Sequence, residues 1–150
     1  MNDDARGIYL DTFLPHPPGQ VWRALTEPDL IARWLMPNDF RLEVGHRFTF
    51  QARPMPAAGF GGTGHSEVLE FEPEKMLRLA WRAAPDDPST LDSTVTFTLE
   101  PEGHGTRLFL AHEGFDPDDT YQEASRRIMG GGWPDIVAGI SRVIDDLPAS

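Results

Sequence analysis

The middle of the chain alternates apolar and polar residues, which is the pattern of strands that bury one face. The clearest run covers residues 93–100, where Val95, Phe97 and Leu99 alternate with threonines. The same period predicts further strands over residues 7–14, 47–53, 65–73, 76–82 and 107–115. Because the alternation is one-sided, we expect an antiparallel sheet with one buried face.

Two short helices are predicted between the first strand and the others. Residues 15–25 begin with prolines that suit a first helical turn and then place apolar residues at helical spacing. Residues 26–35 repeat that spacing, and Thr26 stands three residues before Asp29, which is a capping-box pattern. We therefore expect Thr26 to cap the second helix and Trp34 to lie on its apolar face.

The last third of the chain carries one apolar stripe of helical period that extends to Leu147. Asp116 is a good N-cap and Pro117 suits the first turn, so the helix is predicted to begin there. The stripe covers about seven turns at 3.6 residues per turn. A stripe of this length needs a large apolar partner, and the predicted sheet is the candidate.

Residues 129–140, MGGGWPDIVAGI, weaken this helix in its middle. Glycine costs about 1 kcal/mol per helical position relative to alanine, and interior proline costs about 3 kcal/mol. Because the apolar stripe continues through the segment, we expect one bent helix whose glycines allow a close approach to the sheet. The alternative is two helices that meet at residues 131–132. Trp133 shares its face with Ile136 and Val137, and we expect it to point at the sheet.

Strands and helices are segregated along the chain, in the order one strand, two short helices, the remaining strands and one long helix. This order indicates an α+β protein with about six or seven strands in its sheet. At 150 residues the chain is expected to form one domain, 1–150, with its core over residues 8–147.

Charge and composition exclude several classes of function. The formal net charge is −11 and the basic residues are scattered, so nucleic acid is not expected as a partner. There are no cysteines, which excludes disulfides and thiolate chemistry. The N-terminal stretch has no secretory signal pattern, and no apolar run approaches the ~20 residues of a membrane span. We therefore expect a cytoplasmic protein without membrane insertion.

The motifs of cofactor and metal sites do not occur in a convincing context. Residues 59–64, GFGGTG, match the glycine spacing of a dinucleotide site, but a predicted strand follows them instead of a helix. We interpret residues 54–64 and 84–93 as hairpin loops. No histidine stands near another at metal-ligand spacing, so neither a metal nor another cofactor is predicted.

Three polar residues are candidates for the interior. His112 shares a strand face with Leu108, which predicts that its side chain points inward. His65 and Glu67 share the other candidate face, but Val68 competes for the inner position, so their placement is left open. Polar groups in an apolar interior would have perturbed pKa values. No catalytic residue is assigned.

The large apolar residues are the most informative set. They either pack as a plain core or line a space between the sheet and the long helix. A mostly apolar space with a few polar groups is the usual form of a small-molecule site. The residues predicted to line it are Trp34, Phe48, Phe50, Leu69, Trp81, Phe97, Met129, Trp133, Ile136 and Val137.

The chain resembles the heat-shock protein 90 ATPase activator-like family of the START-like (SRPBCC) superfamily. The resemblance is carried by VWRALTEPDLIARWLMPNDFRLEVGHRFTF, the tryptophan that ends MLRLAW, TVTFTLEPEGHGTRLFLAHEGF and GGWPDIVAGISRVIDDL, and it covers residues 8–147. It implies a helix-grip fold, in which a curved antiparallel sheet wraps around a long C-terminal helix and encloses a cavity. Family members are mostly bacterial, and the superfamily includes lipid and steroid carriers, plant hormone receptors and polyketide aromatase/cyclases.

The resemblance transfers no catalytic residue, because the family shares none. Chaperone activation is not expected, since the eukaryotic activator contacts the chaperone through a separate N-terminal domain for which 150 residues leave no room. Our first hypothesis is a protein that binds a small apolar or amphipathic molecule. The second is a cyclase- or hydrolase-type enzyme that uses His65, Glu67 and His112. The third is a protein-interaction, co-chaperone-like module, with a homodimer left open.

Overall fold

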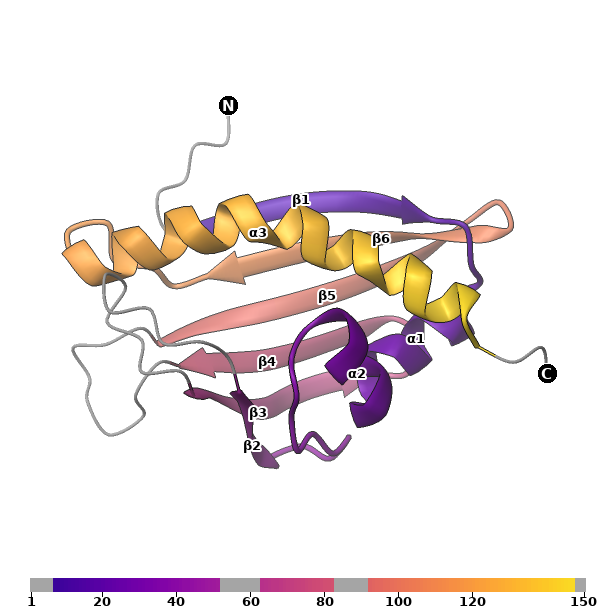
Figure 1. Ribbon diagram of the computed structural model, residues 1–150, viewed down its shortest axis with the longest axis horizontal. Coiled ribbons are helices and arrows are strands. Elements are labelled where there is room, and N and C mark those ends of the chain that lie inside the picture. The colour runs from indigo at the N-terminus through magenta and orange to yellow at the C-terminus, as the bar shows by residue number, and fades with distance from the viewer. Residues whose placement is uncertain (1–6, 52–62, 83–91, 148–150) are drawn as a thin grey trace.

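A computed structural model describes residues 7–51, 63–82 and 92–147. This part of the chain contains a six-stranded antiparallel sheet and three helices (Figure 1). The strands are β1 Gly7–Leu14, β2 Arg47–Gln51, β3 Thr63–Glu72, β4 Met76–Arg82, β5 Asp92–Glu102 and β6 Gly105–Glu113. The helices are α1 Pro18–Thr26, α2 Pro28–Trp34 and α3 Thr120–Asp145. The strand order is β1-β6-β5-β4-β3-β2, so β1 and β2 form the two edges.

The long helix α3 lies along one face of the sheet, with α1 and α2 packed beside it (Figure 1). We call this the inner face and the opposite one the outer face. In β5, Val95, Phe97 and Leu99 are buried on the inner face, and the threonines between them are half-buried. Burying a side chain of this size contributes about 1.5–3 kcal/mol. The expected α+β, helix-grip architecture is confirmed.

The glycine-rich segment does not break α3. The helix is continuous over Thr120–Asp145 with Pro134 inside it, which confirms the prediction of one helix and excludes two. The approach of this segment to the sheet does not depend on the absence of side chains, however. A Cβ at Gly130 would lie 3.8 Å from Cγ1 of Ile8, which is ordinary van der Waals contact, and a Cβ at Gly131 would meet nothing within 4 Å.

The predicted start of α3 is also wrong by one short turn. The helix begins at Thr120, because the Asp119 carboxylate accepts hydrogen bonds from the backbone N–H groups of Tyr121 and Gln122, at 2.9 and 3.0 Å. Two satisfied N–H groups make Asp119 the N-cap. Asp116 lies outside the helix, in the turn that precedes it.

The capping box predicted at Thr26 does not form. Thr26 is the last residue of α1, and its Oγ1 donates to the Trp22 carbonyl oxygen at 2.7 Å. Glu27 precedes α2 and makes no side-chain capping hydrogen bond. The two helices are joined instead by Trp34, whose Nε1–H donates to the Ala24 carbonyl oxygen at 2.7 Å.

Parts of the sequence prediction lie outside the described residues, namely residues 1–6 and most of the segments interpreted as hairpin loops. The strands that flank these segments do pair as antiparallel neighbours, β2 with β3 and β4 with β5. Among the helices of the described ranges, none is long and apolar enough to cross a membrane.

Candidate functional site

Aromatic side chains from the sheet and from α3 meet on the inner face, near the end of β4. Trp81 stands at the centre, with its ring centroid 5.1 Å from that of Phe50 and 5.7 Å from those of Trp133 and His112. Phe97 lies 6.2 Å from Trp133, also by ring centroids. We call these five buried residues the aromatic cluster. They belong to the continuous core of the molecule, or contact it directly.

Five other predicted lining residues belong to the same core or pack against it. Trp34, Phe48 and Val137 are buried in the same core. Met129 and Ile136 are half-buried and pack against it. These placements agree with an inward orientation of all five side chains. Their contact with a ligand remains a prediction.

Strand β3 turns different residues inward from those predicted. Ser66 and Val68 are buried on the inner face, so His65 and Glu67 point to the outer face. Leu69 is 36% exposed, because it continues the outward alternation of His65 and Glu67. The β-bulge that follows Val68 then turns Phe71 inward, opposite Leu77. The interior placement predicted for Leu69 is therefore wrong, and the placement left open for His65 and Glu67 is on the outer face.

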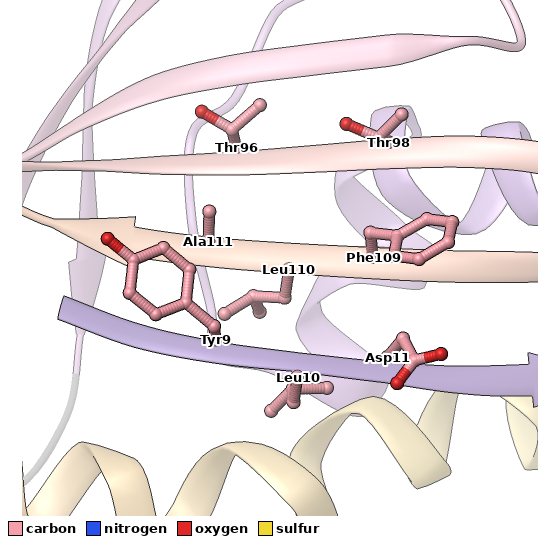
Figure 2. A pocket seen from close by; sticks show the side chains of 8 residues that line it. All are labelled: Tyr9, Leu10, Asp11, Thr96, Thr98, Phe109, Leu110 and Ala111. Atoms are coloured by element: carbon pink, nitrogen blue, oxygen red, sulfur yellow. The ribbon is translucent and has the colours of Figure 1, made fainter. Parts of the chain in front are cut away.

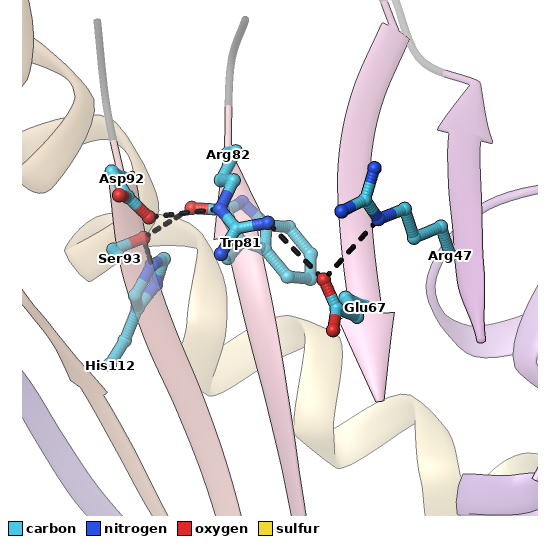
Figure 3. Close-up of polar contacts among 7 residues, drawn as sticks. All are labelled: Arg47, Glu67, Trp81, Arg82, Asp92, Ser93 and His112. Carbon is cyan, nitrogen blue, oxygen red and sulfur yellow. Dashed lines mark hydrogen bonds and ion pairs between the residues drawn. The ribbon is translucent and has the colours of Figure 1, made fainter. Parts of the chain in front are cut away.

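Glu67 takes part in a set of ion pairs on the outer face (Figure 3). Its Oε1 lies 3.6 Å from Nε of Arg47 and 3.6 Å from Nη1 of Arg82. Arg82 Nε donates to Asp92 Oδ1 at 3.0 Å. We call these four residues the outer ladder. Ion pairs on a protein surface contribute at most about 1 kcal/mol each to stability. Because Glu67 points to the outer face, it lies away from the aromatic cluster.

A directional chain of hydrogen bonds runs through the aromatic cluster, and Figure 3 shows its part from His112 through Ser93 to Trp81. Trp133 Nε1–H donates to His112 Nδ1 at 3.1 Å, and an indole can only donate, so Nδ1 carries no proton. The proton of the neutral imidazole is then on Nε2, which donates to Ser93 Oγ at 2.8 Å. The Ser93 hydroxyl donates in turn to the Trp81 carbonyl oxygen at 2.8 Å. Every member of the chain is satisfied.

The His112 imidazole is uncharged in the folded protein. It is fully buried, and burial lowers the pKa of His112 from 6.5 to about 3. The inward orientation predicted for His112 is confirmed. Because Trp133 occupies the lone pair of Nδ1 and Nε2 is a donor, this imidazole positions its neighbours and has no free lone pair to accept a proton.

Polar and aromatic side chains alternate in one row across four strands. Phe48 of β2, Ser66 of β3, Trp81 of β4 and Ser93 of β5 are successive register partners on the inner face. We call them the mixed row. Ser93 has two hydrogen-bond partners, whereas the buried Ser66 Oγ has none. Neither serine was identified from the sequence. Ser66 could have been found, because it stands two residues before Val68 and so shares the inner face of the strand with it.

Two hollows on the surface are separate from the aromatic cluster. One, of about 390 Å³, lies over the outer faces of β1, β6 and β5 (Figure 2). The other, of about 290 Å³, lies between α2 and α3 and includes Trp34 and Ile136. The side chains of the first hollow are Tyr9, Leu10, Asp11, Thr96, Thr98, Phe109, Leu110 and Ala111.

Metal ligation finds no support in the described ranges, where no group of three or more histidine, cysteine, aspartate or glutamate side chains could hold an ion. The chemistry that the described interior offers is therefore apolar contact, ring stacking and uncharged hydrogen bonding. An antiparallel sheet that holds one long helix against its inner face defines a helix-grip α+β protein.

The chain belongs to the family described as activator of Hsp90 ATPase homolog 1-like protein, whose family model matches residues 15–145. Among solved structures, protein MLL2253 from Mesorhizobium loti is 39% identical, with coverage of 96% of this chain and 100% of that one and a TM-score of 0.82. No curated protein matches the chain.

More distant relatives share the fold. CalU16 from Micromonospora echinospora is 26% identical, with a TM-score of 0.70 and coverage of 93% of this chain and 76% of that one. The Aha1 dimer from Colwellia psychrerythraea is 17% identical, with a TM-score of 0.70 and coverage of 93% and 96%. The latter likeness concerns the fold alone.

Proposed function

We propose that this protein binds a small apolar or amphipathic molecule between the inner face of the sheet and α3. The observation that carries the proposal is the mixed row beside the aromatic cluster. Small-molecule sites are mostly apolar and contain a few placed polar groups, and this end of the inner face has that composition. Membership of the family, with its grip-shaped fold, supports the same reading.

Binding is better supported than acid–base catalysis. A cyclase or hydrolase would need at least two polar side chains that converge on a substrate inside the protein. His65 and Glu67 face outward, and both nitrogens of His112 are already engaged by Trp133 and Ser93. The polar groups of the interior are therefore suited to orienting a ligand.

The proposal is tested by native mass spectrometry of the purified protein and by thermal-shift assays with fatty acids, sterols and polycyclic aromatic compounds. A ligand at a hundred times its Kd should stabilise the protein by about 2.7 kcal/mol. Phe50→Ala, which removes a ring of the cluster, should weaken binding about tenfold in calorimetry. Phe109→Ala on the outer face is the control and should bind normally.

The opposite pattern would contradict the proposal. If Phe109→Ala lost the ligand while Phe50→Ala kept it, the site would be the hollow on the outer face. If no compound of these classes changed the melting temperature and none co-purified, binding of such molecules would be refuted.

A second candidate function is self-association through the outer face of β1 and β6. Tyr9, Phe13 and Phe109 are 46%, 43% and 37% exposed there, and β1 is an edge strand. Exposed apolar groups on an edge strand favour association. The Colwellia psychrerythraea relative was solved as a dimer. Light scattering of the purified protein distinguishes monomer from dimer.

A further inference from the structure

The Ser66 hydroxyl is an anomaly of the inner face. It is 4% exposed and has no hydrogen-bond partner, whereas Ser93 in the same row is 3% exposed and has two. Within the described ranges, Ser66 Oγ is the one buried side-chain polar atom without a partner. A buried hydroxyl without a partner destabilises the folded state, so its presence in the core calls for an explanation.

The surroundings of Ser66 are aromatic. Phe48 and Trp81 are its register partners on the two adjacent strands. Gly64 and Ser66 leave little side-chain volume on β3, and the rings of Phe50 and Trp81, from the strands on either side, meet at a centroid distance of 5.1 Å. The buried hydroxyl therefore belongs to a residue whose neighbours on both adjacent strands are aromatic.

We propose that Ser66 is the polar anchor of the ligand site, and that the ligand is a flat aromatic molecule with a hydroxyl or carbonyl oxygen. This inference rests on the proposed function. A serine hydroxyl donates to a carbonyl or accepts from a hydroxyl, so either group would satisfy it. The mixed row contains no charged side chain, and a carboxylate or ammonium group placed there would lack a counter-ion.

Entry of such a ligand requires the rings of Phe50 and Trp81 to separate. A flat ligand that slides between them replaces one ring–ring contact by two, in the offset or edge-to-face arrangements that aromatic groups prefer. Its oxygen then meets Ser66 Oγ, which exchanges an unpartnered hydroxyl for a hydrogen-bonded one. The anchor therefore favours the occupied state over the empty one.

The test is isothermal titration calorimetry with 2-naphthol, 2-methoxynaphthalene and 2-methylnaphthalene, which differ only in their hydrogen-bonding group. Wild-type protein should bind 2-naphthol about tenfold more tightly than 2-methylnaphthalene. In Ser66→Ala this preference should shrink to about twofold or less. 2-Methoxynaphthalene, which only accepts, shows whether Ser66 acts as the donor.

Stability provides the second readout. Ser66→Ala should melt at or above the wild-type temperature, because it removes an unpartnered hydroxyl. Ser93→Ala, the matched control in the same row, should melt several degrees lower, because it removes the acceptor of the buried His112 Nε2–H and the hydrogen bond from Ser93 Oγ to the Trp81 carbonyl oxygen. A role of Ser66 in holding the fold would lower the melting temperature of Ser66→Ala and would overturn the inference.

The remaining outcomes separate the two proposals. If both proteins bind the three compounds with the same preferences, Ser66 is not the anchor, while small-molecule binding stands. If wild-type protein binds none of the three, the anchor is overturned for this ligand class. If the wild-type protein also binds none of the fatty acids, sterols and polycyclic aromatic compounds, the proposed function is refuted as well.

Discussion

His112 is held neutral by two hydrogen bonds of fixed direction. Trp133 occupies the lone pair of Nδ1, and Ser93 accepts the proton of Nε2. Protonation would place a second N–H against the indole N–H, so the charged form loses a hydrogen bond as well as its solvation. At the scale of single residues, the imidazole therefore fixes the Trp133 ring within the aromatic cluster.

This neutrality predicts a dependence of stability on pH. Above pH 6.5 the imidazole is uncharged in both the folded and the unfolded chain. Between pH 6.5 and about 3 the unfolded chain binds a proton that the folded protein does not, so stability falls as the pH falls. The contribution of His112 approaches about 1.4 kcal/mol per pH unit in this window. Urea denaturation at pH 6.5, 5.5 and 4.5 measures the slope.

His112→Gln is the control, because its amide can accept from Trp133 and donate to Ser93 without titrating. The carboxylates of the protein contribute equally to both slopes. Between pH 4.5 and 5.5, the free energy of unfolding of the wild type should fall more steeply with falling pH than that of the variant. The difference should correspond to the uptake of about one additional proton on unfolding. Equal slopes would mean that His112 is protonated in the folded protein over this range.

At the scale of elements, α3 contains a segment whose sequence disfavours a helix. Three consecutive glycines precede Trp133, yet the helix is continuous there. A Cβ at Gly131 would meet nothing within 4 Å, so packing does not require glycine at this position. The segment therefore lowers the stability of the helix without a steric reason.

Gly131→Ala should accordingly stabilise the protein. Alanine is favoured over glycine in a helix by about 1 kcal/mol, and the added methyl group has room. The midpoint of urea denaturation should rise, with an unchanged slope. Gly105→Ala is the opposite control, because its Cβ would come within 2.5 Å of the Leu14 carbonyl oxygen and should destabilise the protein. A lower midpoint for Gly131→Ala would show that α3 needs the glycine.

The elements themselves could be predicted, because alternation and helical spacing act over many residues. The failures are local. Asp116 and Asp119 are equally good N-caps by sequence, and only the turn between them decides which one aligns with the helix. The bulge after Val68 turns Phe71 inward although Leu69, two residues earlier, faces outward, and one irregular residue is enough to do so.

The candidate site was predictable to a lesser degree. The inward orientation of His112 followed from the strand pattern, but its partners Ser93 and Trp133 are 19 and 21 residues away and meet it only through the fold. Ser66 is notable because its buried hydroxyl has no hydrogen-bond partner, and a sequence does not show whether a side chain will find one in the fold. Site prediction failed where it depended on contacts between elements.

At the scale of the whole molecule, the two faces of the sheet differ in what covers them. The inner face is covered by α3, whereas the outer face of β1 and β6 exposes Tyr9, Phe13 and Phe109. The net charge of −11 opposes close association of two copies at low ionic strength. Self-association through this face should therefore become stronger as salt is added.

Light scattering at 50 and 500 mM NaCl tests this expectation. If the outer face is an interface, the dimer fraction should rise with salt, and Phe109→Ser should shift the protein toward monomer. Ile128→Ser, which alters an exposed apolar residue on α3, is the matched control and should behave as the wild type. Equal mass for wild type and Phe109→Ser at both salt concentrations would remove the outer face as an interface.

The outer ladder and the mixed row occupy neighbouring positions of the same four strands. Arg47 adjoins Phe48, Glu67 adjoins Ser66, and Arg82 and Asp92 adjoin the other two members of the row. A single residue inserted into β3 before Ser66 would exchange the two faces and carry a carboxylate among the aromatic rings. Evolution or design can thus change the identity of residues at this end of the sheet, while the number of residues in each strand is constrained.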